Sequence, residues 1–293
     1  MKKYFITVII IFGIGNLYSQ TVKYSTSWFG PNANPVPEFS DATIPQKTNI
    51  DLTADYYQGF GQYGNGDKTI NGYFKIELPL LPERVSLKVW TTIFEHYNVT
   101  QELGDYRGMG NLQGKSNGDF YVQTRISVLK ERESWPAIIL NSTLKTASGT
   151  DFADRRYFDT PGYYFDVEFG KSLFLKSKLI TEIRAVADLG FLCWETTGSR
   201  QDDAPMYGVK LIAGNEKWKF ENTFSGYWGW MHTYPPYGSD YGDAPMVYTS
   251  KFIIPTYYMN YFVQYQYGIK DFPYQQFRFG ISFPVEKLTP KYR

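Results

Sequence analysis

The chain is poor in cysteine, histidine, net charge and long apolar runs. Its 293 residues include one cysteine, Cys193, and two histidines, His96 and His232. A single cysteine excludes an intramolecular disulfide. The 30 basic residues are balanced by 29 acidic ones, so the chain lacks the positive charge on which nucleic-acid binding depends. Outside the N-terminus there is no apolar run of about 20 residues, which excludes a polytopic helical membrane protein.

Aromatic side chains, in contrast, are abundant. The sequence holds 26 Tyr, 22 Phe and 7 Trp, and the three types make up 19% of all residues. The mean hydropathy is nevertheless −0.38. Such a chain is too aromatic and too balanced in charge to be disordered. Because Tyr and Trp favour boundaries between apolar and wet surroundings, their excess is the feature that any fold must explain.

Residues 1–19 have the parts of a secretory signal peptide. Lys2 and Lys3 form a positive start, residues 4–14 are apolar, and Ser19 precedes a predicted cut before Gln20. The apolar stretch is too short to span a bilayer, which argues against a membrane anchor. No cysteine follows the cut, so a lipoprotein is excluded.

From residue 48 onward the sequence alternates between apolar and polar residues. In one stretch Val122 and Ile126 share one parity, whereas Gln123 and Arg125 share the other. A period of two is typical of a β-strand, because successive side chains point to opposite faces. The pattern predicts twelve strands, at about 50–57, 70–78, 85–93, 119–128, 137–147, 162–170, 179–195, 205–214, 217–230, 246–255, 257–268 and 275–285.

The predicted connections alternate in length. Short ones lie near residues 79–84, 130–136, 171–178, 214–217 and 255–256, and long ones near 97–117, 148–161, 196–204 and 231–245. An even number of strands with short turns on one side and long loops on the other is typical of a bacterial outer-membrane barrel. We therefore predict an all-β, transmembrane, antiparallel up-and-down barrel over residues 48–285, with both termini in the periplasm of a Gram-negative bacterium.

A soluble barrel or sandwich fits the same alternation, but the placement of aromatic and charged residues favours the membrane. Aromatic residues near strand ends suit the interfacial girdles of a membrane barrel: Tyr56, Tyr97, Tyr163, Trp194, Trp228, Trp230 and Tyr257. The polar parity carries nine acids and nine bases, enough for ion pairs across a narrow wet lumen. The predicted lining residues are Asp51, Asp55, Lys75, Glu77, Lys88, Arg125, Lys145, Glu168, Glu182, Arg184, Lys210 and Arg278.

Several segments resemble outer-membrane β-barrels of the Bacteroidota. The signal ending Tyr18-Ser19-Gln20 and the alternating strand over residues 276–283 are of that type. Residues 29–37 and 161–166 are similar to segments of uncharacterised porin-like proteins in that group. The resemblance covers most of the mature chain and concerns architecture. It implies a porin-like barrel and carries no catalytic or binding residue.

Residues 20–47 lack strand periodicity. Four prolines, among them Pro35 and Pro37, make this segment extended and stiff. It is interpreted either as a periplasmic leader or as a plug that Trp28 and Phe29 anchor in the barrel mouth. Residues 286–293 form a polar tail that is expected to fray. Three residues break the alternation, Ile139 and Ile253 on the polar parity and Asn222 on the apolar one, and a bulge or a register shift would explain each.

No motif predicts catalysis. Residues 59–64 match a dinucleotide-binding string without the helix that such a site needs. Ser142 and Lys145 match a serine acyl-enzyme string, yet they point to opposite faces of a strand. His96 shares the parity of Lys88, which places it in the lumen, and His232 lies in a loop. We expect no enzyme, no cofactor and no metal, since the loop acids at 202–203 and 240–243 lack regular ligand spacing.

The leading functional expectation is a narrow channel for passive passage of small polar solutes, with weak ion selectivity because the lumen charges balance. The alternative is a non-conducting barrel that serves as an envelope assembly or interaction scaffold. A lipid-modifying barrel enzyme is the third possibility. The expected partners are outer-membrane lipids and lipopolysaccharide, the solutes and the barrel-assembly machinery, and no nucleic acid.

Overall fold

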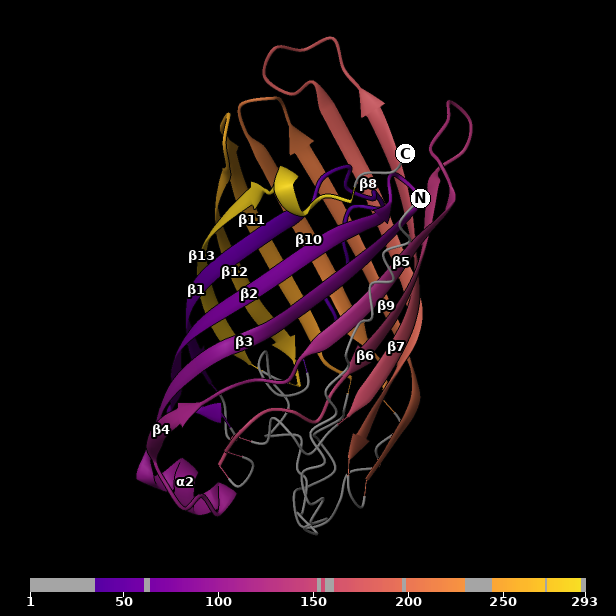
Figure 1. Cartoon of the computed structure of the whole chain (residues 1–293). Coiled ribbons are helices and arrows are strands. Elements are labelled where there is room, and N and C mark those ends of the chain that lie inside the picture. Colours follow the sequence, from indigo (N-terminus) through magenta and orange to yellow (C-terminus); the bar gives the residue numbers. More distant parts are fainter. Residues whose placement is uncertain are drawn as a thin grey trace, which may run out of the picture.

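Twelve antiparallel strands close into a barrel (Figure 1). The computed structural model describes residues 35–60, 64–151, 154–155, 161–196, 199–229, 244–271 and 273–290. Neighbouring strands pair antiparallel, and β1 closes the ring by pairing with β13. The strands are β1 (Asn49–Gly59), β2 (Asp67–Leu81), β3 (Val85–Val99), β4 (Gln113–Ser116), β5 (Tyr121–Leu129), β6 (Ala137–Lys145), β7 (Gly162–Phe174), β8 (Glu182–Thr196), β9 (Ser199–Gly214), β10 (Lys219–Tyr227), β11 (Met246–Pro255), β12 (Asn260–Lys270) and β13 (Tyr274–Pro284).

The short strand β4 extends only the end of β3 and stands outside the ring, so the predicted twelve-stranded all-β up-and-down barrel is confirmed. A helix, α2 (Gln101–Arg107), lies next to β4. Both elements fall within the connection near 97–117 that the sequence presented as a loop. The predicted loop near 196–204 is also wrong, since β8 and β9 stay paired up to Thr196 and Ser199. No helix among the described residues is long and apolar enough to cross a membrane.

The first and last barrel strands begin and end at the same end of the barrel. Asn49 of β1 pairs with Pro284 of β13, whereas α2 lies at the opposite end (Figure 1). The tail after β13 does not fray where it is described. The Val285 amide donates to the Thr48 carbonyl (2.7 Å), and Glu286–Leu288 form a 3-10 turn that Thr289 ties to the Thr48 amide (2.9 Å).

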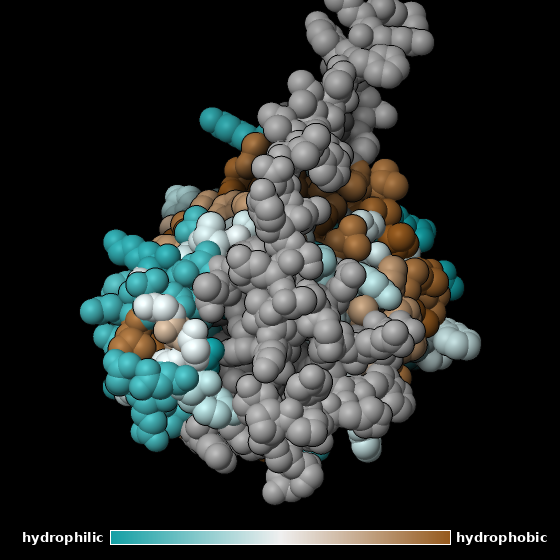
Figure 2. All heavy atoms as spheres, turned by 90° about the horizontal axis from the view of Figure 1, so that it is seen from below, coloured by the Kyte–Doolittle hydropathy of each residue, from teal (hydrophilic) through white to brown (hydrophobic). Residues whose placement is uncertain are grey.

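The outer wall of the barrel is apolar. Outward residues such as Ile70, Leu189 and Val209 are more than half exposed, which no water-soluble surface of this extent sustains. The view from the α2 end shows hydrophilic residues on the side where α2 lies and hydrophobic residues on the opposite flank (Figure 2). The alternation of the sequence thus places apolar residues outside and polar residues inside, as in barrels that face lipid.

A β-bulge in β3 reverses the parity of its second half. Thr92 pairs with Tyr73 and Phe94 pairs with Gly72, so Ile93 has no partner on β2. Before the bulge in sequence, the even-numbered side chain of Lys88 points inward. After the bulge, the odd-numbered side chain of Tyr97 points inward. The prediction that Tyr97 belongs to an outer girdle is therefore wrong: its side chain is 1% exposed. The placement of His96 in the lumen is wrong for the same reason.

Candidate functional site: the occupied barrel interior

Residues 35–47 run inside the barrel, and we call them the plug segment. Its backbone amides are bound by one carboxylate of the wall: Ser40 donates to Glu168 Oε1 (2.8 Å) and Ala42 donates to Oε2 (3.0 Å). Glu168 lies on β7 and is 1% exposed. The described half of the stretch that the sequence left open between leader and plug therefore lies in the lumen. Trp28 and Phe29, the expected anchors, fall outside the described residues.

Basic side chains of the wall bind the carbonyls of the plug segment. Arg184 of β8 donates from Nε to the Asp41 carbonyl (2.7 Å), and Lys210 of β9 donates to the carbonyls of Phe39 (2.5 Å) and Ser40 (3.1 Å). Charge-assisted hydrogen bonds of this kind are about twice as strong as neutral ones. Among the described residues, no backbone-to-backbone hydrogen bond joins the plug segment to a barrel strand. Where the structure describes the contacts, side chains alone hold the segment against the wall.

An apolar seat on the inner wall receives the plug segment. The plug residues Phe39, Ala42 and Ile44 pack in one buried cluster against wall residues on the otherwise polar inner face. The wall residues are Ala137, Ile139 and Val186. The break in alternation at Ile139 is thus no register error, because the side chain faces inward to meet the plug. Gly208 leaves the room for Phe39, since a Cβ there would lie 2.2 Å from the ring.

The other two breaks have separate outcomes. Asn222 does point outward, and its side-chain oxygen accepts a hydrogen bond from the Tyr248 hydroxyl (2.6 Å). This bond satisfies a polar group on an apolar wall. Ile253 of β11 is half-buried on the inward parity.

Arg125 is the centre of one buried ion-pair network. Its guanidinium lies 2.7 Å from Glu77 Oε1 and 2.9 Å from Glu168 Oε2, and Nε donates to Asn141 (3.3 Å). Because Glu168 also binds the plug segment, Arg125 connects the plug, through Glu168 of β7, to Glu77 of β2. Arg125 is 1% exposed, so its charge depends on these partners.

A second network lies at the α2 end of the interior. Asp67 of β2 pairs with Arg107 (2.8 Å) and Arg155 (3.1 Å), and Arg155 also pairs with Glu95. The carboxylate of Asp154 accepts the amides of Gly110 (2.7 Å) and Asn111 (3.1 Å). Sequence reasoning missed this set, because the bulge hid the inward parity of Glu95 and the two arginines lie in connections without periodicity.

All twelve predicted lining residues lie on the interior face. Seven are buried, and the other five, Lys75, Glu77, Glu182, Lys210 and Arg278, each bind another interior group. Their placement agrees with the alternation, and lining of a conducting lumen stays a prediction. The residues pair mostly with wall or plug, as in Lys145 with Asp119 (2.7 Å) and Lys75 with Asp51 (2.5 Å).

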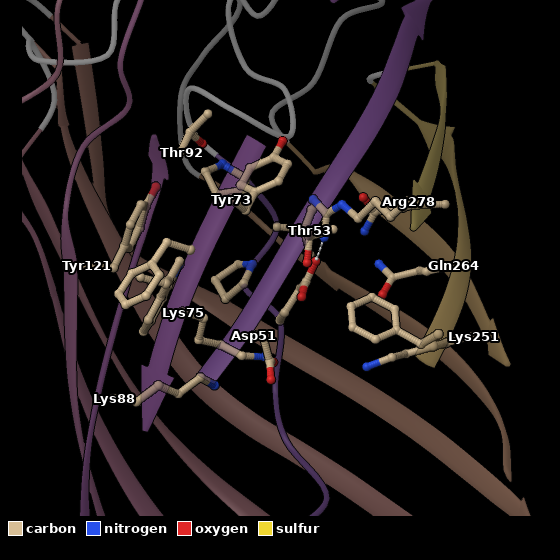
Figure 3. A pocket seen from close by; sticks show the side chains of 18 of the residues that line it. Asp51, Thr53, Tyr73, Lys75, Lys88, Thr92, Tyr121, Lys251, Gln264 and Arg278 are labelled. Carbon is tan, nitrogen blue, oxygen red and sulfur yellow. Dashed lines mark hydrogen bonds and ion pairs between the residues drawn. The ribbon is translucent and has the colours of Figure 1, made fainter. Parts of the chain in front are cut away.

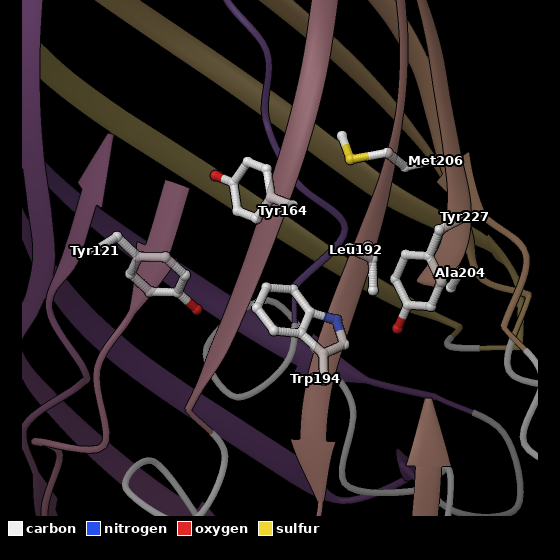
Figure 4. Packing of buried hydrophobic residues seen from close by; sticks show 7 residues of the cluster. All are labelled: Tyr121, Tyr164, Leu192, Trp194, Ala204, Met206 and Tyr227. Atoms are coloured by element: carbon white, nitrogen blue, oxygen red, sulfur yellow. The ribbon is translucent and has the colours of Figure 1, made fainter. Parts of the chain in front are cut away.

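The predicted aromatic girdle is split between the two faces. Tyr56, Tyr163, Trp228 and Tyr257 are exposed, whereas Trp230 lies outside the described residues. The prediction that Trp194 belongs to the girdle is wrong, because this residue shares the parity of Arg184 and is fully buried inside the barrel. There it joins an interior aromatic cluster (Figure 4), whose members are Tyr121, Tyr164, Leu192, Trp194, Ala204, Met206 and Tyr227.

A cavity of about 150 Å³ lies between the plug segment and this aromatic wall (Figure 3). Pro35, Val36 and Pro37 of the plug line one side. Side chains from β1, β2, β3, β5, β7, β8, β11, β12 and β13 complete the lining, with Lys75, Lys88 and Lys251 among its charged groups.

Outside the strands, one carboxylate binds the Arg184 side chain that also binds the plug segment. Glu131, in the turn after β5, accepts hydrogen bonds from the Ser172 amide (2.8 Å) and from Arg184 Nη1 (2.6 Å). Burial opposes ionisation of this carboxyl, but these two hydrogen bonds outweigh it and hold the pKa of Glu131 below its ordinary range.

The described residues contain no group of three or more His, Cys, Asp or Glu side chains placed to hold a metal ion. His96 is exposed on the outer face, where its Nδ1 lies 3.0 Å from the Gly114 carbonyl and its cross-strand neighbours are Ile70 and Lys115. His232 falls outside the described residues, as do the acids at 240–243.

Solved structures of bacterial outer-membrane barrels share this fold. The COG4313 outer membrane channel from Pseudomonas putida F1 is 11% identical with a TM-score of 0.57, and the match covers 85% of this chain and 100% of that one. LpxR from Salmonella typhimurium is 8% identical with a TM-score of 0.50, and covers 80% of this chain and 100% of that one. No protein-family model matches the sequence. No curated protein matches it either.

Proposed function

We propose that this protein is an outer-membrane channel for small polar solutes whose lumen the plug segment closes at rest. The observation that carries the proposal is the mode of attachment of that segment. It crosses a polar interior and is bound through side chains such as Glu168, Arg184 and Lys210, without joining the sheet. Side-chain contacts break one at a time. A strand that is hydrogen-bonded into the sheet, in contrast, leaves only when the barrel wall itself opens.

The fold supports the proposal. The barrel is like that of a Pseudomonas putida outer membrane channel along the full length of that protein. Delivery through a signal peptide over residues 1–19, a Bacteroidota source and a periplasmic position for both termini belong to the same proposal. So do contacts with lipopolysaccharide and outer-membrane lipids through the apolar wall, and insertion by the barrel-assembly machinery.

Planar-bilayer recording tests the channel and its closure together. The full mature chain is expected to conduct rarely, and a variant lacking residues 21–46 is expected to conduct steadily. A second variant, Arg184→Gln with Lys210→Gln, removes the wall contacts to three plug carbonyls and keeps the chain length. It is expected to open more often than the wild type.

The matched control for the double variant is Lys68→Gln with Lys219→Gln, which changes two exposed lysines on β2 and β10. Folding of each protein is checked by its resistance to SDS before heating. Steady conduction by the wild type would reject closure by the plug. Silence of all folded variants would reject the channel.

The packed interior also favours a second candidate, the non-conducting scaffold. Networks such as Arg125 with Glu77 and Glu168 hold wall and plug together, as a sealed core requires. Silence of the folded deletion variant is the outcome that distinguishes this candidate from the channel.

We propose transport and not catalysis. LpxR shares the fold at 8% identity, which extends to architecture only. The bulge places His96 on the outer wall, where a lipid-modifying enzyme would need it, but its cross-strand neighbours Ile70 and Lys115 supply no hydroxyl nucleophile. A lipid-release assay on His96→Ala and wild type tests this point. Activity that is present in the wild type and lost in the variant would support the enzyme hypothesis.

A further inference from the structure

The cavity beside the plug segment has a cationic surplus. Four basic residues line it, Lys75, Lys88, Lys251 and Arg278, against two acids, Asp51 and Glu38. Lys75 pairs with Asp51 and Arg278 pairs with Glu38. Lys88 and Lys251 have no carboxylate within ion-pair distance among the described residues. The described lining therefore carries two positive charges without an ion-pair partner, although Glu77 and Glu221 stand opposite Lys88 and Lys251 on the neighbouring strands.

The position of these two amines makes the surplus costly. Lys88 is 8% exposed, and in the part of the chain that the structure describes its ammonium lies 3.3 Å from the Ser40 hydroxyl and 5.2 Å from the centre of the Trp90 ring. Lys251 lies over the Phe262 ring at 4.3 Å. A buried charge without a counter-ion is strongly disfavoured unless an anion or water reaches it. An anion in the cavity would supply a counter-charge to the amines that line it.

The unpaired polar atoms of the lining also point to an acceptor. Tyr121 Oη, Trp194 Nε1 and Gln264 Nε2 are buried and have no hydrogen-bond partner among the described residues. Amide and indole nitrogens only donate, and a phenol hydroxyl donates as well as accepts. Ammonium groups and free donors in one cavity suit a ligand rich in oxygen acceptors.

Ring faces supply the rest of the lining. Trp90 and Tyr121 are stacked, with centroids 5.0 Å apart and planes at 10°, and Tyr164 meets Trp194 edge to face at 6.2 Å. In Figure 3, Tyr73 and Tyr121 lie toward one end of the cavity, and Lys88 and Asp51 lie toward the other. A ligand with a flat body and one charged end fits this polarity.

The cavity volume suits a ligand with a small body. A cavity of about 150 Å³ equals the engineered apolar cavity in T4 lysozyme that binds one benzene molecule. The site therefore has room for a single six-membered ring with a small substituent.

We infer that this cavity is a binding site for a monocyclic aromatic carboxylate, whose ring packs on Trp90, Tyr121 and Tyr73 and whose carboxylate pairs with Lys88 and Lys251. This site goes beyond the channel proposal, because it requires no conduction and would exist in a sealed barrel too. It deepens the channel proposal only in that such an acid would be bound where a solute passes the plug.

Isothermal titration of the full mature protein in detergent tests the site, with benzoate as the probe. Benzoate is expected to bind in a 1:1 ratio, and more weakly as salt rises because the contact is ionic. Benzyl alcohol keeps the ring without the charge, and acetate keeps the charge without the ring. Both are expected to bind at least about tenfold more weakly, since each loses one half of the contacts.

Two variants locate the site. Lys88→Gln and Lys251→Gln are each expected to weaken benzoate binding about tenfold or more and to leave benzyl alcohol unaffected. The matched control, Lys68→Gln, removes an exposed lysine from the outer face of β2 and is expected to bind benzoate as the wild type does. Removal of an unpaired buried charge does not endanger folding, which SDS resistance verifies.

Three results would overturn the inference: no saturable benzoate binding by folded wild type, equal affinity for benzyl alcohol, or equal losses in Lys68→Gln and Lys88→Gln. None of these results depends on the conductance of the barrel, so failure of the site and failure of the channel remain distinguishable.

Discussion

Arg125 is a buried cation that lies between two carboxylates of the interior. It is 1% exposed and its guanidinium binds two carboxylates, Glu77 at 2.7 Å and Glu168 at 2.9 Å. Arg125→Gln leaves both acids without their cation, and loss of one partner of a buried pair costs about 3–5 kcal/mol. The free energy of unfolding in detergent, measured by denaturant titration, is expected to fall by that amount.

The matched control for Arg125→Gln is Lys130→Gln. Lys130 pairs with Glu83 near the same end, but both side chains are about half exposed. Exposed pairs contribute about 0–1 kcal/mol, so the control is expected to unfold almost as the wild type does. Equal losses of unfolding free energy in the two variants would show that Arg125 is more hydrated than its burial in the structure indicates.

At the same scale, the sequence predicted residue positions wherever strict alternation held and failed where a partner decided the outcome. Asp51 and Arg125 follow the parity of their strands and lie inside as predicted. Ile139 breaks the parity for a reason invisible in its own strand, because Phe39, about a hundred residues earlier, packs on it. Trp194 was assigned by its residue type, although its parity with Arg184 already placed it inside.

Among the elements, β3 carries the correction with the widest effect. One unpaired residue, Ile93, moves Tyr97 inside and His96 outside. Cysteine labelling tests this register: in His96→Cys a charged maleimide is expected to react on the folded protein, whereas in Tyr97→Cys it is expected to react only after unfolding. The native Cys193 is buried and contributes no background in the folded state.

The reverse labelling pattern would place Tyr97 outside and remove the bulge. A control at Lys68→Cys, on the exposed face of β2, is expected to react in the folded protein regardless of the register of β3. Bulges of one residue are hard to predict, because Thr91, Thr92 and Ile93 are all good strand formers and the sequence contains no glycine at the site.

The plug segment shows a different limit of sequence reasoning. Its prolines predicted an extended chain, and the structure has no helix or strand over residues 35–47. Whether such a chain lies in the lumen depends on Glu168, Arg184 and Lys210, whose parity only says that they face inward. The contacts between segment and wall join residues far apart in the sequence, such as Ser40 and Glu168 at 128 positions, and no local pattern encodes them.

For the whole molecule, the aromatic excess has two destinations. Exposed rings such as Tyr56 and Trp228 lie on the outer wall, and a second set, including Tyr164, Trp194 and Tyr227, fills the interior near the α2 end. The low mean hydropathy follows from an interior that is lined by charges and closed by ion pairs. The girdle alone accounts for only the first set.

The balance of these charges shifts when the plug segment leaves, and this predicts the selectivity of the open barrel. Removal of residues 21–46 takes away Glu38, which pairs with Arg278, and the carbonyls that bind Arg184 and Lys210. Arg184 keeps Glu131 and Arg278 keeps Asp55, but each loses a plug contact, and Lys88, Lys210 and Lys251 have no ion-pair partner among the described residues. The deletion variant is therefore expected to prefer anions modestly, whereas balanced lumen charges alone predict weak selectivity of either sign.

The reversal potential in a KCl gradient measures this preference. Lys88→Gln with Lys251→Gln in the deletion background is expected to move it toward zero, and a cation preference in the deletion variant would contradict the assignment of these amines to the lumen.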